Sequence, residues 1–123
     1  MIKQRICIVG DGLSGLMTAV ILSKVSGVEV NLIAKKGIKN ADKRTTAISD
    51  TNYKFINQNI KSLEQKLFWP SQKIDLFYET SKENINFLNL NEANSNLMYV
   101  FENDKIKSIL VKEISKNKIK LVR

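Results

Sequence analysis

A glycine motif near the amino end constrains the fold of this chain most strongly. Residues 10–15 read Gly-Asp-Gly-Leu-Ser-Gly, directly after the apolar run at residues 6–9 and directly before an apolar helical pattern. This order of strand, G-x-G-x-x-G turn and helix is typical of a βαβ unit that binds a dinucleotide. Gly10 allows the tight turn, Gly12 lets the backbone approach a pyrophosphate, and Gly15 allows the helix to pack closely on the sheet. The alternative is a glycine-rich turn in an α/β protein of another kind.

Hydrophobic periodicity predicts the elements around this motif. Residues 2–9 form an almost continuous apolar run, as expected for a buried central strand of a parallel sheet. The apolar side chains of residues 13–25 recur at helical spacing, and Gly27 ends that helix. Residues 28–34 alternate as a second strand, and a right-handed crossover makes this strand parallel to the first.

Two further helices are predicted from apolar side chains that recur every three or four positions. They cover residues 50–67, ended by the Trp-Pro pair at 69–70, and residues 103–115. The candidate N-caps are Ser49 or Asp50 for the first helix and Asn103 or Asp104 for the second.

Further strands are predicted in the second half of the chain. Residues 73–79 and 84–90 alternate and form a β-hairpin, whose polar link is residues 80–83. Residues 119–122 begin another strand, which would have to pair with elements supplied from elsewhere. The predicted apolar faces of the hairpin are Ile74, Leu76 and Tyr78 on its first strand and Ile85 and Phe87 on its second.

The formal net charge of +8 permits binding to nucleic acid or to an anionic surface. The lysines are spread along the chain, however, and no arginine-rich patch with interleaved aromatic residues is present. We therefore interpret the lysines as solvated faces and expect no nucleic-acid partner.

The cysteine and histidine content excludes several kinds of site. The sequence has no histidine and one cysteine, Cys7, which is expected to be a small core residue. One thiol cannot form an internal disulfide, which favours a reducing cytoplasm. A His/Cys metal site is excluded, and a Ser-His-Asp or Cys-His mechanism lacks its base. Asp11 and the glycines interrupt the apolar N-terminal stretch, which argues against a signal peptide or a transmembrane helix.

The end of the second predicted strand departs from the usual dinucleotide site. An Asp or Glu there normally binds the ribose hydroxyls, but this chain has Ala34. The loss of each charge-assisted hydrogen bond weakens ribose recognition by roughly 1.5–3 kcal/mol. Lys35 and Lys36 leave open a phosphorylated ribose, as in NADP, the alternative being that both lysines are simply solvated.

A more specific pattern follows at residues 42–49, Asp-Lys-Arg-Thr-Thr-Ala-Ile-Ser. This segment resembles the FAD-dependent aromatic hydroxylases of ubiquinone biosynthesis, which are para-hydroxybenzoate-hydroxylase-like flavoprotein monooxygenases. The resemblance continues through the predicted helix and hairpin to residues 97–103, which include a Glu-Asn pair. It therefore covers most of the chain.

The resemblance implies an α/β fold: a Rossmann-like FAD-binding βαβ unit with an inserted β-hairpin. The βαβ unit would occupy residues 1–36, the FAD loop and helix residues 42–67, the hairpin residues 73–90, and a further helix residues 103–115. Because members of the family are considerably longer, we expect a truncated, partial FAD-binding domain over residues 1–123, which would not hydroxylate anything alone.

The resemblance also implies roles for particular residues. The glycine turn would face the FAD pyrophosphate, Arg44 would lie on the phosphate–ribitol side of the flavin, and Asn103 would lie near the cofactor. Ala34 takes the place of the ribose-binding acid, and Lys35 follows it. The implied cofactor-binding residues are thus Gly10, Gly12, Leu13, Ser14, Gly15, Ala34, Lys35, Arg44 and Asn103.

The chemistry implied by the resemblance belongs to the cofactor, so no residue is assigned a catalytic role and no metal is expected. NAD(P)H would reduce the flavin, and the substrate would be an aromatic quinone precursor. The implied partners are the missing C-terminal part and other proteins of the pathway. The expected location is the cytoplasm, with at most peripheral association with the inner membrane.

Two other functions stay open. A nucleotide-binding or interaction module without redox chemistry is favoured by Ala34 and by the absence of the second FAD motif, a Gly-Asp pair. A fragment of an NAD(P)-dependent reductase is favoured by Lys35 and Lys36.

Overall fold

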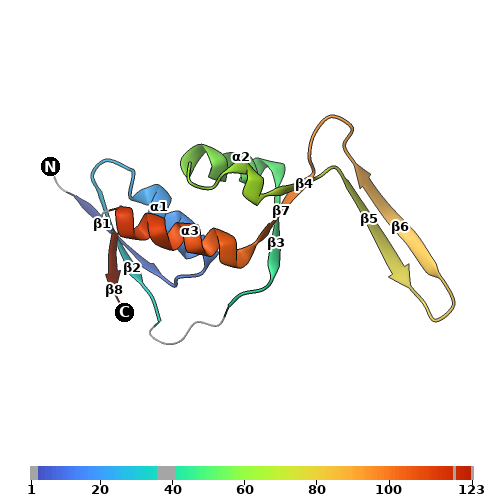
Figure 1. Ribbon diagram of the computed structural model, residues 1–123, viewed down its shortest axis with the longest axis horizontal. Helices are drawn as coiled ribbons and strands as arrows, with labels where there is room; N and C mark the ends of the chain where they lie inside the picture. Colours follow the sequence, from blue (N-terminus) through green and yellow to red (C-terminus); the bar gives the residue numbers. More distant parts are fainter. Residues whose placement is uncertain (1–2, 36–40, 118, 123) are drawn as a thin grey trace.

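A small parallel sheet forms one end of the molecule in the computed structural model. Strand β1 (Gln4–Val9), helix α1 (Leu13–Leu22) and strand β2 (Val28–Ile33) follow one another, and the two strands pair in parallel. Strand β8 (Ile119–Val122) pairs in parallel with the other edge of β2, which gives the order β1-β2-β8 (Figure 1). The residues that the structure describes are 3–35, 41–117 and 119–122.

A second, antiparallel sheet has the order β3-β7-β4. It consists of β3 (Thr45–Ser49), β7 (Met98–Glu102) and β4 (Trp69–Ser71). Helix α2 (Asp50–Asn59) follows β3 directly, and α3 (Asn103–Lys116) follows β7 directly. These two sheets, the helices and a hairpin confirm the mixed α/β class.

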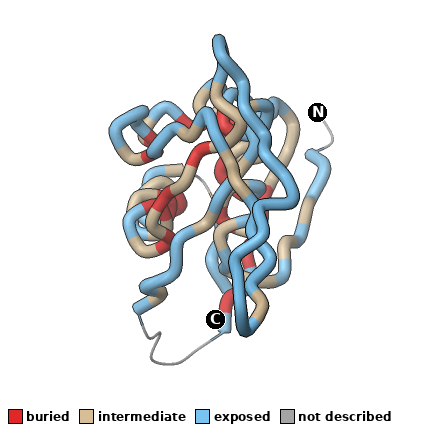
Figure 2. Tube along the Cα trace, turned by 90° about the vertical axis from the view of Figure 1, so that its right-hand side faces the viewer, coloured by how far each residue is buried: buried red, intermediate tan, exposed pale blue. Residues whose placement is uncertain are grey.

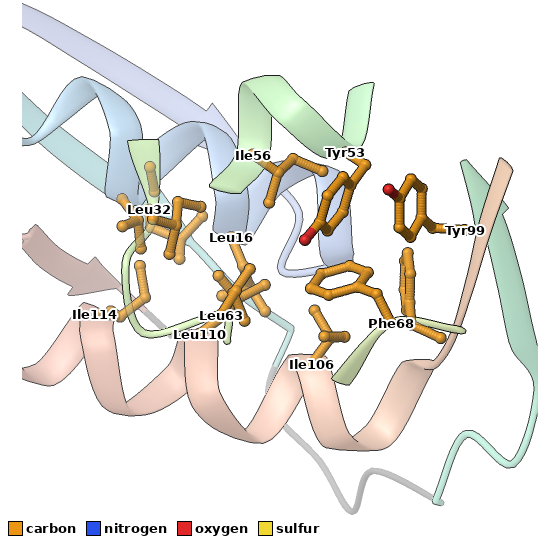
Figure 3. Packing of buried hydrophobic residues seen from close by; sticks show 14 of the residues in the cluster. Leu16, Leu32, Tyr53, Ile56, Leu63, Phe68, Tyr99, Ile106, Leu110 and Ile114 are labelled. Atoms are coloured by element: carbon orange, nitrogen blue, oxygen red, sulfur yellow. The ribbon is translucent and has the colours of Figure 1, made fainter. Parts of the chain in front are cut away.

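Helices α1 and α3 lie side by side (Figure 1). Between them and the parallel sheet lies the apolar core, where Leu16, Leu32 and Leu110 from α1, β2 and α3 come together (Figure 3). Each of these side chains is at most 2% exposed. Burial of one such side chain stabilises the fold by about 1.5–3 kcal/mol, so this core joins the two helices to the sheet.

Four aromatic residues continue the core toward the antiparallel sheet (Figure 3). Tyr53 of α2 stacks on Tyr99 of β7 with ring centroids 3.7 Å apart. Phe68 packs edge-on against Tyr53 at 5.1 Å and against Phe101 at 5.5 Å. Since these residues come from α2, from the segment before β4 and from β7, the cluster holds these elements together.

Strands β5 (Lys73–Glu79) and β6 (Asn84–Asn91) pair antiparallel and form a hairpin that projects away from the body of the molecule (Figure 1). Figure 2 shows it running across the front of the view, exposed along most of its length. Every residue of β6 is exposed, so the hairpin buries little of its surface against the rest of the described chain.

Two helices are shorter than their sequence patterns predict. Helix α1 ends at Leu22, and a turn leads to Gly27, whose φ of 77° requires the left-handed region that glycine adopts easily. The prediction of one helix over residues 50–67 is wrong beyond Asn59, because Ile60 leaves the helical conformation with φ −126° and ψ 86°. The chain bends there and buries both Ile60 and Leu63 completely, and only a 3-10 turn, η1 (Gln65–Leu67), follows.

The capping residues follow the predictions at one helix and not at the other. Ser49 caps α2, since its hydroxyl accepts a hydrogen bond from the Asn52 backbone N–H. Neither Asn103 nor Asp104 caps α3; the N-cap is Glu102, whose side chain makes no capping hydrogen bond. The side chain of Asn103 is used elsewhere, as described below.

The parallel sheet corrects three expectations. Strand β8 pairs with β2 of the same chain, whereas its partner was expected to be supplied from elsewhere. The central strand is β2, whereas β1 is an edge strand and is not buried, so Cys7 is exposed instead of lying in the core. Among the described residues, no element covers the sheet face opposite the helices: Val9, Ile33 and Val122 occupy one row across it and are 80%, 39% and 42% exposed. Ile2 and Lys36, which entered the sequence predictions, lie outside the described residues.

Candidate dinucleotide-binding site

The turn between β1 and α1 is built on Gly10. Its φ is +109°, a conformation that residues with a side chain rarely adopt. Its N–H donates to the carbonyl oxygen of Ile33 over 2.8 Å, which ties the turn to the end of β2. The turn therefore lies at the carboxyl ends of two parallel strands, where ligands bind in open α/β sheets.

The fold requires a glycine at position 15 but not at position 12. A Cβ on Gly15 would lie 2.1 Å from the carbonyl oxygen of Gly10, so no side chain fits there. A Cβ on Gly12 would meet nothing within 4 Å, and the backbone of Gly12, at φ −70° and ψ 174°, suits any residue. Thus neither space nor conformation within the described chain requires glycine at position 12, and the open side of this residue fits a phosphate that approaches the backbone.

The start of α1 is suited to an anion. Gly12 is its N-cap and offers no side-chain hydrogen bond, and no acidic residue lies in its first turn. Leu13 is half-buried and Ser14 is exposed. The unpaired N–H groups of this turn and the positive end of the helix dipole favour a bound phosphate.

A cavity of about 80 Å³ lies next to this turn, between the two helices and the ends of β2 and β8. Ala34 is 6% exposed and forms part of its wall, and its N–H donates to the Val122 carbonyl oxygen over 2.9 Å. The missing ribose-binding acid thus leaves a mostly apolar wall, while Lys35 is exposed. The lining residues are Asp11, Leu16, Leu32, Ala34, Val111, Ile114, Ser115 and Leu121.

A polar network joins the segment before β3 to the start of α3. Arg44 donates twice to the carboxylate of Asp42, from Nε to Oδ1 over 2.7 Å and from Nη2 to Oδ2 over 2.8 Å. Asn103 donates from Nδ2 to the same Oδ2 over 3.0 Å and accepts at Oδ1 from the Thr46 hydroxyl over 2.6 Å. Asn103 is only 6% exposed, so its side chain orders this corner of the molecule.

The electrostatics of the network follow from these contacts. The guanidinium of Arg44, together with the Asn103 amide, holds the pKa of Asp42 well below its usual range, and Asp42 in turn raises the pKa of Arg44. The Arg44 side chain is 81% exposed. A guanidinium has five N–H donors, so three of them stay available to a phosphate after the two bonds to Asp42.

Replacing Asp42 by asparagine is expected to alter the acid unfolding of the protein. The folded-state pKa of Asp42 is lowered, so its charged form contributes stability above the unfolded-state pKa of about 3.9, and this is lost as the pH falls through the folded-state value. Asp42→Asn should therefore be less stable than wild type at pH 7, with a difference that narrows below about pH 4. Urea unfolding from pH 7 to pH 2 measures this, and Glu92→Gln, at an exposed position, is the control. An unchanged difference at all pH values would contradict the role of the Asp42 carboxylate.

The structure groups the predicted residues into two sets. Gly10, Gly12, Leu13, Ser14 and Gly15 form the turn, which a backbone hydrogen bond joins to the strand that ends beside Ala34. Arg44 and Asn103 belong to the second set, where the Asn103 N–H also donates to the Arg44 carbonyl oxygen over 3.1 Å. Sequence reasoning missed Asp42 and Thr46 as partners, and also Asp104, whose Oδ1 accepts a hydrogen bond from the Asp42 N–H over 2.8 Å. The acidic residue two positions before Arg44 was the available signal.

The described residues offer neither a metal site nor a membrane-spanning helix. No group of three or more metal-ligating side chains is present in residues 3–35, 41–117 and 119–122. Over the same residues, no helix is long and apolar enough to cross a membrane. No family model and no curated protein matches the sequence.

The mixed α/β fold of this chain matches part of the FAD-dependent monooxygenase fold. The 2-methyl-3-hydroxypyridine-5-carboxylic acid oxygenase superimposes with a TM-score of 0.67 at 13% identity, over 98% of this chain and 31% of that chain. For p-nitrophenol 4-monooxygenase PnpA from Pseudomonas putida DLL-E4 the TM-score is 0.67 at 16% identity, over 98% of this chain and 31% of that one. The Diels-Alderase PyrE3 of pyrroindomycin biosynthesis gives 0.67 at 17% identity, over 98% and 25%.

At these identities the likeness establishes the fold and leaves the reaction open. The chain spans between about a quarter and a third of the length of the structures that it matches, 27%, 31% and 25% in three of them.

Proposed function

We propose that this chain binds FAD and forms the cofactor-binding portion of a flavin-dependent monooxygenase that hydroxylates an aromatic ring. The observation that carries the proposal is the open side of Gly12 at the start of α1, where nothing in the described fold requires a glycine. A pyrophosphate that approaches the backbone does require one. The match to part of the monooxygenase fold supports FAD over other dinucleotides.

The residues of the chain have distinct roles in this proposal. Gly10 and Gly15 shape the turn, and the N–H groups of Leu13 and Ser14 donate to the pyrophosphate. The exposed N–H groups of Arg44, held in place by Asp42, bind on the phosphate–ribitol side. Bound FAD, reduced by NAD(P)H, supplies the oxygen-activating chemistry.

The proposed substrate class is an aromatic precursor of ubiquinone, which rests on the resemblance at residues 42–49 and 97–103. No residue of this chain is assigned a catalytic acid or base. Hydroxylation therefore needs the polypeptide that supplies the rest of the fold, and the setting that we propose is the cytoplasm or the surface of the inner membrane.

The proposal is tested by titrating the purified protein with FAD, with NADPH as a parallel control, while following flavin fluorescence and thermal stability. Saturable FAD binding with a rise in Tm is the expected result, because a ligand that binds only the folded state stabilises it. A folded protein that binds neither nucleotide would refute the proposal, and preferential binding of NADPH would favour a reductase instead.

A non-catalytic nucleotide-binding module is the second candidate, favoured by the apolar cavity wall at Ala34. Such a module needs no ribose-binding acid and no further cofactor motif. It would bind AMP or ADP as tightly as FAD, whereas the flavin-binding function requires a clear preference for FAD in the same titration.

Replacing Ala34 by glutamate is expected to tighten FAD binding about tenfold, because a carboxylate at the end of β2 can accept hydrogen bonds from the ribose hydroxyls. Each such bond contributes roughly 1.5–3 kcal/mol, part of which is offset by the nearby carboxylate of Asp11. Fluorescence titration measures the Kd, and Ala34→Leu, which adds volume without an acceptor, is the control. Equal affinities for Ala34→Glu and Ala34→Leu would place the ribose elsewhere.

A further inference from the structure

The hairpin has one face that is entirely apolar. Ile74 lies opposite Leu90, Leu76 opposite Leu88, and Tyr78 opposite Ile85. Because side chains alternate along a strand, these three cross-strand pairs share one face. We call them the apolar hairpin face; its members are Ile74, Leu76, Tyr78, Ile85, Leu88 and Leu90.

A β-bulge makes this face continuous. The register shifts between Leu76 and Phe77, so that Leu88 and Asn86 oppose these two residues and Phe87 is left without a partner. The extra residue brings Ile85 onto the same face as Leu88. The predicted face that joins Ile85 to Phe87 does not include Leu88 and Leu90, because simple alternation along the sequence does not account for the bulge.

The charged side chains of the two strands lie on the opposite face. Lys73, Asp75 and Glu79 occupy the alternate positions of β5, and Lys73 pairs with Asp75 at 2.9 Å. The apolar hairpin face has no charged residue, and it is open to water, since Tyr78 is 62% exposed and Leu90 is 42% exposed. Covering this face would therefore remove apolar surface from water without desolvating a charge.

An uncovered hairpin of this kind is not expected to be stable alone. Two-stranded hairpins are marginally stable in water and normally need a third strand or a packed partner. Exposed apolar patches of a few hundred Å² mark interaction surfaces. The hairpin also projects from the body of the chain, so the described elements do not cover it (Figure 1).

The fold of this chain accompanies much more polypeptide in the structures that it matches. The matched region includes 98% of this chain but only 31% of the 2-methyl-3-hydroxypyridine-5-carboxylic acid oxygenase and of PnpA. In those proteins more than two thirds of the polypeptide therefore lies outside the matched region. We propose that the apolar hairpin face is the docking surface for the polypeptide that supplies the rest of this fold, an inference that rests on the proposed function.

A second copy of this chain fits the surface less well. The segment 73–92 carries four carboxylates and two lysines and is therefore acidic. Two hairpins packed face to face would bring like net charges together. A partner that is basic around its contact with the hairpin suits this acidic segment better than a second hairpin does.

The test uses the polypeptide encoded downstream of residue 123, produced as a separate chain. Its Kd for this protein is measured by sedimentation for wild type and for two double variants. Leu76→Asp with Leu88→Asp places two charges on the apolar hairpin face, and Phe77→Asp with Asn86→Asp places the same two charges on the neighbouring pair of the opposite face. Circular dichroism and FAD titration of each variant verify that the body of the chain is folded.

We expect tight binding by wild type, a loss of about a hundredfold or more in the Leu76/Leu88 variant, and near wild-type binding by the Phe77/Asn86 variant. Equal loss in both variants would overturn the proposal, as would the absence of binding or of any such encoded polypeptide. If wild type forms a dimer that is lost in the Leu76/Leu88 variant and kept in the Phe77/Asn86 variant, the surface belongs to a second copy and the proposal fails. FAD titration of the chain alone separates these outcomes from a failure of the proposed function.

Discussion

Gly12→Val is expected to abolish FAD binding while the chain remains folded. The valine side chain has space, because a Cβ at this position meets nothing within 4 Å, and the φ of −70° suits it. Valine is a poorer N-cap than glycine, so the free energy of unfolding should fall by no more than about 1 kcal/mol. The new side chain would occupy the space in which a pyrophosphate contacts the backbone, and we expect the Kd to rise at least about a hundredfold.

The measurement is a fluorescence titration with FAD beside a urea unfolding curve of the same sample. Ser26→Val, at an exposed position beyond the other end of α1, is the control and should bind FAD far better than Gly12→Val. If Gly12→Val binds FAD as wild type does, the pyrophosphate is not at this turn and the proposed function fails.

Gly15→Ala is expected to lower the free energy of unfolding strongly, whereas Gly12→Val mainly weakens FAD binding. The added methyl group would lie 2.1 Å from the carbonyl oxygen of Gly10 and 3.2 Å from its carbonyl carbon. Both are backbone atoms of a turn that is itself fixed by the bond from Gly10 to Ile33, so the clash can be relieved only by moving α1 away from the sheet. We expect destabilisation of about 3 kcal/mol or more, above the usual range of single substitutions.

Urea unfolding measures this loss, and Gly12→Ala is the control because it makes the same chemical change at the open position. FAD binding by Gly15→Ala should weaken only as far as the folded fraction falls. Wild-type stability of Gly15→Ala would show that α1 does not pack against the turn as described. Together the two glycines separate a requirement of the ligand from a requirement of the fold.

The fold alone does not identify the reaction. The structures that match this chain equally well include an oxygenase, a monooxygenase and a Diels-Alderase. The glycine turn and the segment around Arg44 support FAD binding, and the variants at Gly12 and Asp42 test these two places.

Local patterns determined much of the secondary structure. The strand and turn around Gly10, the strands of the hairpin, helix α3 and the strand at residues 119–122 all follow from features within a few residues, such as alternation, helical spacing and glycine geometry. The sequence also identified Gly12, Arg44 and Asn103 as candidate residues before their surroundings were known. Their proposed contacts with a cofactor stay predictions.

Long-range contacts decided the rest. Which strand is central depends on the pairing of β8 with β2, and α2 ends at Asn59 because Ile60 and Leu63 are buried against elements distant in sequence. The hydrogen bonds of Asp42 with Arg44 and Asn103 span as many as 61 positions, and the bulge that unites the apolar hairpin face depends on the partner strand. The physical reason is that propensity and periodicity act between neighbours along the chain, whereas pairing, burial and charge neutralisation depend on residues that only the folded chain brings together.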